Sequence, residues 1–210
     1  ADQAAFGLRL LGGDTTAAPG PACLSLTILG RSGRPLRRKG ARPGDGLWVT
    51  GTIGDGALGL AALQGRLADP TRTLAERYHL PQPRLGLRLG DLASAGLDVS
   101  DGLVQDVGHL CAAGEVAAVI EAARVPLSPA AAAAGPSWRE TVLTGGDDYE
   151  LAFALPSAAE AALQARAATA GVAVTRIGYF EAGPAAVRVV DETGQPVRLA
   201  QTGWQHFRCL

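Results

Sequence analysis

The chain has 210 residues, of which 47% are hydrophobic and 19% charged, and its formal net charge is −1. This length suits one domain, or one domain and part of another, and the nearly neutral charge argues against nucleic acid or an anionic membrane surface as a partner. No apolar run reaches the roughly 18 residues of a membrane span, and Cys23, Cys111 and Cys209 lack Cys-x-x-Cys spacing. We therefore expect a cytoplasmic protein with neither a disulfide framework nor a zinc site.

The first half of the chain contains a few short elements. Alternating apolar and polar residues predict a half-buried strand over residues 24–28, and a second short strand is expected over residues 46–51. Between them, the basic and turn-rich residues 33–43 are expected to form a connector. A helical pattern runs from Asp55 to Leu63, and a further helix is expected from Pro81 to Leu92.

The second half alternates strands with helices. Strands are expected near Asp98 and over residues 116–120, 150–155 and 172–177, followed by a hairpin of residues 185–190 with 197–199. Helices are expected after Ser100 and over residues 130–134 and 158–170. Because the alternation is irregular and includes a hairpin, it favours an α+β layered domain over a regular doubly wound sheet.

The segment Leu97-Asp98-Val99-Ser100-Asp101-Gly102-Leu103 carries the clearest chemical signal. It places two carboxylates at a strand-to-helix junction, where they are suited to hold Mg²⁺, while the free N–H groups of the helix start suit phosphate. The alternative is that Ser100 and Asp101 only cap the helix.

Two further acidic clusters follow glycine pairs, at Gly12-Gly13-Asp14 and at Gly145-Gly146-Asp147-Asp148. Glycines let backbone N–H groups approach an anionic ligand, and the adjacent acid can accept a metal ion. Each cluster alone could be an ordinary Gly-Asp turn. Neither is a Walker A loop or a Gly-x-Gly-x-x-Gly fingerprint, so the usual nucleotide-binding folds are not indicated.

Together these motifs resemble those of the thiamine-monophosphate kinases, within the aminoimidazole-ribotide-synthetase-like superfamily. The similar segments keep the family's order and spacing over nearly the whole chain, at residues 11–16, 36–45, 49–55, 80–84, 98–103, 145–151 and 203–207. The resemblance implies that residues 34–210 form the C-terminal α+β domain, a layered sheet-and-helix fold. It also implies that residues 1–33 are the end of an N-terminal ATP- and Mg-binding domain, whose Gly-Asp-Asp metal motif has no counterpart here.

The resemblance implies ATP- and Mg²⁺-dependent phosphorylation of thiamine monophosphate to thiamine diphosphate, in a homodimer, with ATP and the metal ions between the two domains. Carried over residue by residue, it assigns the metal to Asp14, Asp98 and Asp101, the nucleotide to Gly13, Asp14, Arg38 and Ser100, and the substrate to Asp147 and Trp204. Asp147 stands where the family usually has Glu, so its shorter side chain reaches less far toward the substrate.

This chemistry fits the residues that the chain offers. A phosphate acceptor is already anionic and needs no general base, so direct in-line transfer depends on charge neutralisation and alignment by carboxylate-bound Mg²⁺. The absence of an evident catalytic His or Cys is then expected. Two site residues keep a structural alternative, because Arg38 could be a solvated charge of the connector and Trp204 could anchor the C-terminal tail in the core.

Two other functions remain open at this point. The first is another ATP-dependent synthetase of the same superfamily, in purine biosynthesis or selenophosphate formation. The second is a non-catalytic binding or assembly module, because without the Gly-Asp-Asp motif the Mg²⁺ site lacks several carboxylates. On that ground we expect this chain alone to have little kinase activity.

Overall fold

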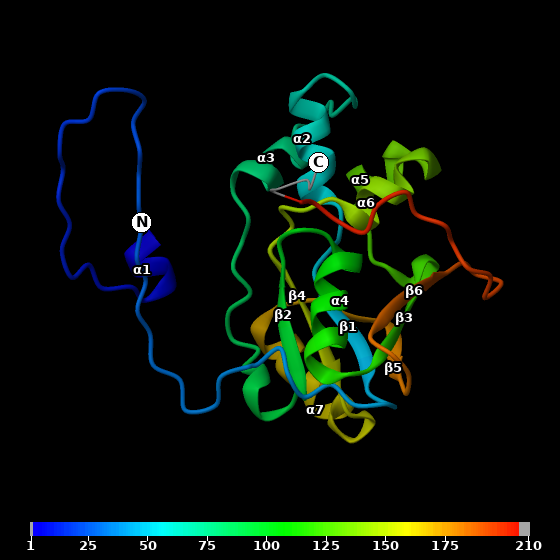
Figure 1. Ribbon diagram of the computed structural model, residues 1–210. Helices are drawn as coiled ribbons and strands as arrows, with labels where there is room; N and C mark the ends of the chain where they lie inside the picture. Colours follow the sequence, from blue (N-terminus) through cyan, green and yellow to red (C-terminus); the bar gives the residue numbers. More distant parts are fainter. Residues whose placement is uncertain (1, 206–210) are drawn as a thin grey trace. The chain divides into compact units, whose positions relative to one another are not determined.

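The computed structural model describes residues 2–205 of the chain (Figure 1). It consists of two compact units, Ala1–Gly33 and Arg34–Leu210, which are described separately below. Two predicted features, Cys209 and the end of the segment at residues 203–207, lie outside the described residues. None of the described helices is long and apolar enough to cross a membrane.

The first unit contains one short helix, α1 (Asp2–Phe6), followed by irregular chain. The strand predicted over residues 24–28 is wrong. Leu24, Leu26 and Ile28 are 98%, 82% and 65% exposed, and residues 2–33 contain no strand. A strand needs hydrogen-bonded neighbours and a face to bury, so the alternating pattern has nothing to pair with inside this unit.

The second unit is built on a six-stranded sheet with the order β2-β4-β1-β5-β3-β6 (Figure 1). Its strands are β1 (Gly46–Thr50), β2 (Ala95–Val99), β3 (Ala117–Glu121), β4 (Glu150–Leu155), β5 (Val174–Glu181) and β6 (Ala186–Val190). All neighbours are antiparallel except β3 and β6, which are parallel. The expected strands of this unit are confirmed, but the final hairpin is reduced to one bridge, Val190 with Pro196, and a hydrogen bond from Val197 N to Val189 O.

Helices surround the sheet. They are α2 (Asp55–Leu63), α3 (Thr73–His79), α4 (Leu103–Gly114), α5 (Pro129–Ala134), α6 (Arg139–Thr144) and α7 (Glu160–Ala170). Short 3-10 turns occur at η1 (Leu89–Asp91), η2 (Ala122–Arg124), η3 (Pro136–Trp138) and η4 (Ser157–Ala159). Both α3 and α6 were missed by the sequence prediction.

The helix predicted from Pro81 to Leu92 is also wrong, because only η1 forms there. Two prolines lack the N–H that a helix needs, and Gly86 adopts a left-handed φ of 89°. The chain stays extended, and Leu87 is buried against the sheet instead.

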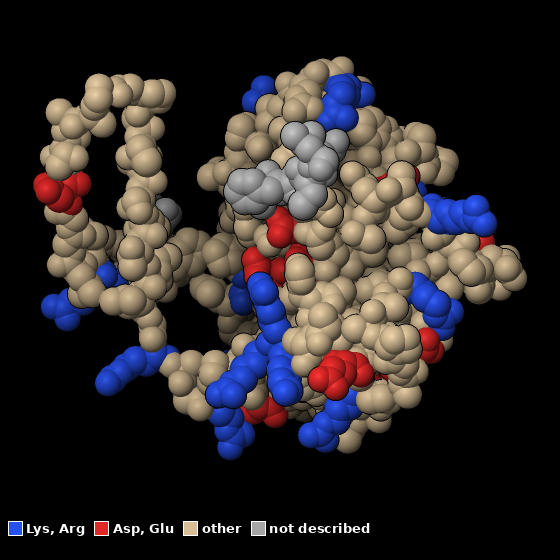
Figure 2. All heavy atoms as spheres, in the orientation of Figure 1, with Lys and Arg blue, Asp and Glu red and all other residues tan. Residues whose placement is uncertain are grey.

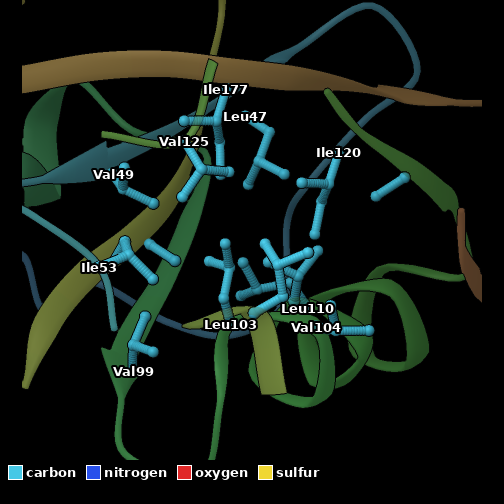
Figure 3. Close-up of a cluster of buried hydrophobic side chains, with 14 of the residues drawn as sticks. Leu47, Val49, Ile53, Val99, Leu103, Val104, Leu110, Ile120, Val125 and Ile177 are labelled. Atoms are coloured by element: carbon cyan, nitrogen blue, oxygen red, sulfur yellow. The ribbon is translucent and has the colours of Figure 1, made fainter. Parts of the chain in front are cut away.

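The sheet separates two apolar cores because successive side chains of a strand point to opposite faces. In β1, Leu47 and Val49 face the larger core, whereas Trp48 faces the smaller one. Figure 3 shows side chains of the sheet meeting Leu103 and Leu110 of α4 in the larger core. On the other face, Trp48, Phe153 and Leu155 pack with Leu163 and Ala167 of α7, which gives a helix–sheet–helix arrangement.

The strand register brings three loops to one end of the sheet. Val99, the last residue of β2, is opposite Glu150, the first residue of β4. The end of β1 lies beside the same part of β4, since Val49 is opposite Ala152. The loops at residues 51–54, 100–102 and 145–149 therefore lie at the same end of the sheet.

Candidate functional site

The loop at residues 145–149 packs directly on the loop that follows β2. Asp147 N donates to Ser100 O at 3.0 Å, and Tyr149 N donates to Val99 O at 2.8 Å. A Cβ atom at Gly146 would overlap the carbonyl oxygen of Ser100, so this approach requires glycine. The two acidic segments that the sequence singled out are thus joined backbone to backbone.

These loops form one wall of a cleft of about 740 Å³. Four of its lining residues, Ser100, Asp101, Asp147 and Trp204, are predicted site residues. The cleft is also lined by Tyr149 and by α2, Tyr78 and Arg66. The structure therefore brings together residues that are up to about 150 positions apart in the sequence, with acidic groups and aromatic rings on the same surface.

Asp106 shapes the turn that carries Ser100 and Asp101. Its buried carboxylate accepts hydrogen bonds from the backbone N–H groups of both residues, each at 3.0 Å. Burial raises the pKa of Asp106, although these two hydrogen bonds oppose the shift. The tail is tied to the same turn, because Trp204 N donates to Asp101 O at 2.8 Å and Gln105 Nε2 donates to Trp204 O at 2.8 Å.

Asp147 and Tyr149 both face the cleft, and both have a left-handed φ, of 69° and 52°. The Tyr149 hydroxyl donates to Asp147 Oδ1 at 3.3 Å. The pKa of Tyr149 is raised, first by partial burial and then by the negative charges of Asp147, Asp98 and Asp101. Three carboxylates therefore act electrostatically on one point of the cleft wall.

Two buried acids of the same segment were not recognised in the sequence. Asp148 and Glu150 have no exposed surface, and they alternate with Asp147 and Tyr149 along the chain. The sequence offered no signal for this burial, because the left-handed φ values of Asp147 and Tyr149 interrupt the regular alternation of an extended segment. Glu150 accepts hydrogen bonds from Arg77, Arg84 and Thr50.

Mg²⁺ commonly uses one or two carboxylates and completes its shell with water and phosphate oxygens. Asp98 and Asp101 supply such oxygens, three residues apart. Within residues 2–205, no group of three or more His, Cys, Asp and Glu side chains is arranged to hold a metal ion. A complete site then needs ligands from the nucleotide or from elsewhere.

Of the four remaining predicted site residues, Asp98 and Arg38 belong to the second unit but do not line this cleft. Gly13 and Asp14 are exposed residues of the first unit, where the Asp14 carboxylate accepts from Thr15 N at 2.8 Å. Arg38 is exposed on a segment that runs along β2, since Gly96 N donates to Arg37 O at 2.9 Å. Figure 2 shows a group of Lys and Arg side chains beside a group of Asp and Glu side chains on one face.

Comparison with known proteins gives this arrangement a family. Residues 42–191 match the family described as "AIR synthase related protein, C-terminal domain". The chain belongs to this family. The match covers the whole sheet and all the loops of the cleft except the tail that carries Trp204.

Relatives with closer sequences carry a more specific name. The chain is 40% identical to "Thiamine-monophosphate kinase" of Caulobacter vibrioides, over 98% of this chain and 60% of the relative. A solved thiamine-monophosphate kinase from Stenotrophomonas maltophilia K279a is 41% identical with a TM-score of 0.69, covering 75% of this chain and 53% of that one. A structure described as "AaThiL complexed with AMPPCP and TMP" is 32% identical with a TM-score of 0.67, covering 82% and 54%.

The chain thus spans about three fifths of the curated relative, at 60% of its length. The sequence resemblance to the thiamine-monophosphate kinases is confirmed, as is the α+β fold of the C-terminal domain type.

Proposed function

We propose that the full-length protein to which this chain belongs phosphorylates thiamine monophosphate to thiamine diphosphate, with ATP as the phosphoryl donor and Mg²⁺ as the metal. One observation carries the proposal. Ser100, Asp101, Asp147 and Trp204 meet at one cleft in a chain that is 40% identical to a thiamine-monophosphate kinase. The solved relative that is complexed with AMPPCP and TMP supports both substrates.

The reaction requires the protein to bind and orient the phosphates of ATP and of thiamine monophosphate. Mg²⁺ held by Asp98, Asp101 and Asp14 would neutralise charge on the phosphate oxygens. Ser100, Gly13 and Arg38 would contact the nucleotide, and the acceptor oxygen, which is already anionic, needs no general base. Asp106 holds the Ser100 and Asp101 amides and so fixes the turn in advance of binding.

The substrate would lie against the aromatic part of the cleft. The Trp204 ring would stack on the cationic thiazolium or on the pyrimidine, a contact of about 1 to 2 kcal/mol when desolvated. Asp147 would contact the substrate, and its hydrogen bond to the Tyr149 hydroxyl keeps the short carboxylate at the cleft wall. We further propose that the protein is a homodimer and that it is located in the cytoplasm.

An activity assay on the full-length protein tests the reaction. Purified protein is incubated with ATP, Mg²⁺ and thiamine monophosphate, and thiamine diphosphate is measured directly. We expect turnover that depends on all three additions. Turnover of formylglycinamidine ribotide or of selenide, without turnover of thiamine monophosphate, would instead establish another synthetase of the superfamily.

A second candidate concerns the 210-residue chain by itself, as a binding or assembly module without catalysis. It is favoured because residues 2–205 contain no complete metal-binding group. We expect the isolated chain to bind nucleotide weakly at best and to turn over little substrate. Robust turnover by the isolated chain would exclude this candidate.

A further inference from the structure

We propose that Asp148 is a positioning residue of the cleft: its buried carboxylate ties the loop at residues 145–149 to the start of α2 and thereby holds Asp147 and Tyr149 against the substrate. The inference rests on the proposed function for its kinetic test only. Its structural part concerns contacts within this chain.

The Asp148 carboxylate accepts two hydrogen bonds from backbone N–H groups at the start of α2. Asp148 Oδ2 accepts from Gly54 N at 2.7 Å, and Oδ1 accepts from Gly56 N at 3.0 Å. The first N–H groups of a helix have no partner within the helix, and Gly54, the residue ahead of α2, has no side chain to cap them. A carboxylate from a loop more than ninety residues later takes this role.

The backbone of Asp148 is held by a further hydrogen bond. Arg77 of α3 donates from Nη2 to Asp148 O at 2.6 Å. The loop also packs closely on α2, because a Cβ atom at Gly56 would overlap the carbonyl oxygen of Asp147. Asp148 is therefore fixed to both α2 and α3.

The flanking residues need such an anchor. Asp147 and Tyr149 have φ values of 69° and 52°, in a region that non-glycine residues seldom adopt. Backbone strain of this kind persists only where the surrounding structure determines it. With Asp148 pinned between them, both side chains point to the cleft that they line. Without the hydrogen bonds of Asp148, we expect the loop to relax and the Asp147 and Tyr149 side chains to move away from the cleft.

The strength of the same contact also depends on the charge state of Asp148. Burial raises the pKa of Asp148 to about 7, against the two backbone hydrogen bonds. Asp55 of α2 raises it further, and Arg77 of α3 lowers it. A protonated carboxyl accepts the two N–H bonds less well than the anion, so the tie should weaken in mild acid.

The kinetic test compares Asp148→Asn with Asp45→Asn in the full-length protein. The amide of Asn can accept only one of the two N–H bonds, so we expect KM for thiamine monophosphate to rise about tenfold while kcat changes less than about threefold. Asp45 is a matched control, since it is also buried and also accepts a backbone N–H, from Arg42. It lies at the opposite end of β1, and its replacement should leave KM unchanged.

The pH dependence separates positioning from mere loss of fold. The ratio of KM between Asp148→Asn and wild type should shrink between pH 8 and pH 6, because wild type then protonates toward the neutral state of the variant. Titration of the substrate affects both proteins and cancels in this ratio. A ratio that does not change with pH, or an equal rise of KM in Asp45→Asn, would overturn the proposal.

Amide hydrogen exchange provides a test that needs no substrate. We expect the protection of the Gly54 and Gly56 amides in wild type to fall as the pH is lowered through 7, after correction for intrinsic exchange rates. This measurement stands even if Asp148→Asn does not fold. If wild type does not turn over thiamine monophosphate, the proposed function fails, whereas unchanged protection of both glycines would refute the role of Asp148.

Discussion

Arg77 Nη2 lies 2.8 Å from Glu150 Oε1, and Glu150 has no exposed surface. Arg84 forms a second ion pair with the same carboxylate, and Thr50 donates to it from Oγ1 at 2.6 Å. One buried acid thus joins α3, the extended segment around Arg84, β1 and β4.

This relationship predicts a large effect of Glu150→Gln on stability. The substitution leaves two mostly buried guanidinium groups facing a neutral acceptor, and we expect the free energy of unfolding to fall by about 3 to 5 kcal/mol. Urea unfolding of the full-length protein measures this loss. Glu121→Gln is the control, because its ion pair with Arg124 is exposed and should contribute less than about 1 kcal/mol. Equal losses in the two variants would contradict the prediction.

The elements that could be predicted from the sequence are those whose pattern is local. Helix α2 follows from its apolar residues and the turn at residues 54–56, strand β4 follows from the short apolar run at residues 151–155, and the strand–turn–helix around Asp98 follows from its apolar residues. The strand expected over residues 24–28 failed although its alternation is regular, because a strand also needs a partner. Periodicity predicts which residues can be buried, but it does not show whether a neighbouring strand or helix is present to bury them.

The site divides in the same way. The turn that carries Ser100 and Asp101 could be predicted from the sequence, since it is contiguous with α4, and the metal and nucleotide roles of Asp98, Ser100 and Asp101 stay predictions. The roles of Asp148 and Glu150 are not, because their partners Gly54, Arg77 and Arg84 lie more than sixty residues away. The acids after the two glycines look alike in the sequence, whereas the fold buries Asp148 and Glu150 and leaves Asp147 at the cleft.

A pH-dependent stability is predicted for Asp148. Its pKa rises from 3.8 to about 7 on folding, so within this range the folded state retains a proton that the unfolded state has released. The free energy of unfolding should therefore fall as pH rises through this window, by up to about 1.4 kcal/mol per pH unit, and level off above it.

Denaturant unfolding of wild type and Asp148→Asn at several pH values isolates this contribution, because other titrating groups cancel in the difference. Wild type should lose stability relative to the variant as pH increases from about 4 to 7. A constant difference would mean that Asp148 titrates alike in both states. If the prediction holds, the Asp148 anion that positions the loop also lowers the free energy of unfolding, as is common for groups at functional sites.

The metal-binding role is tested by Asp98→Asn and Asp101→Asn in the full-length protein. Neither side chain is part of the buried core, so we expect the fold to be retained and turnover to fall by at least about 100-fold. Varying Mg²⁺ at fixed substrate concentrations shows whether the loss lies in metal binding. Normal turnover by Asp98→Asn at limiting Mg²⁺ would show that this acid is only an exposed residue of β2 and not a metal ligand.

Trp204→Ala separates the two interpretations of the tryptophan. Its side chain is 59% exposed and lines the cleft, while its backbone is held by Asp101 and Gln105, so removing the ring leaves those hydrogen bonds possible. We expect KM for thiamine monophosphate to rise about tenfold, with kcat and KM for ATP little changed, because uniform binding of the substrate is lost. Trp204→Phe keeps a ring for stacking and should recover most of this loss. Steady-state kinetics with each substrate varied independently, together with a thermal unfolding curve, decide the matter: a lower melting temperature with an unchanged KM would make Trp204 an anchor of the tail and not a part of the substrate site.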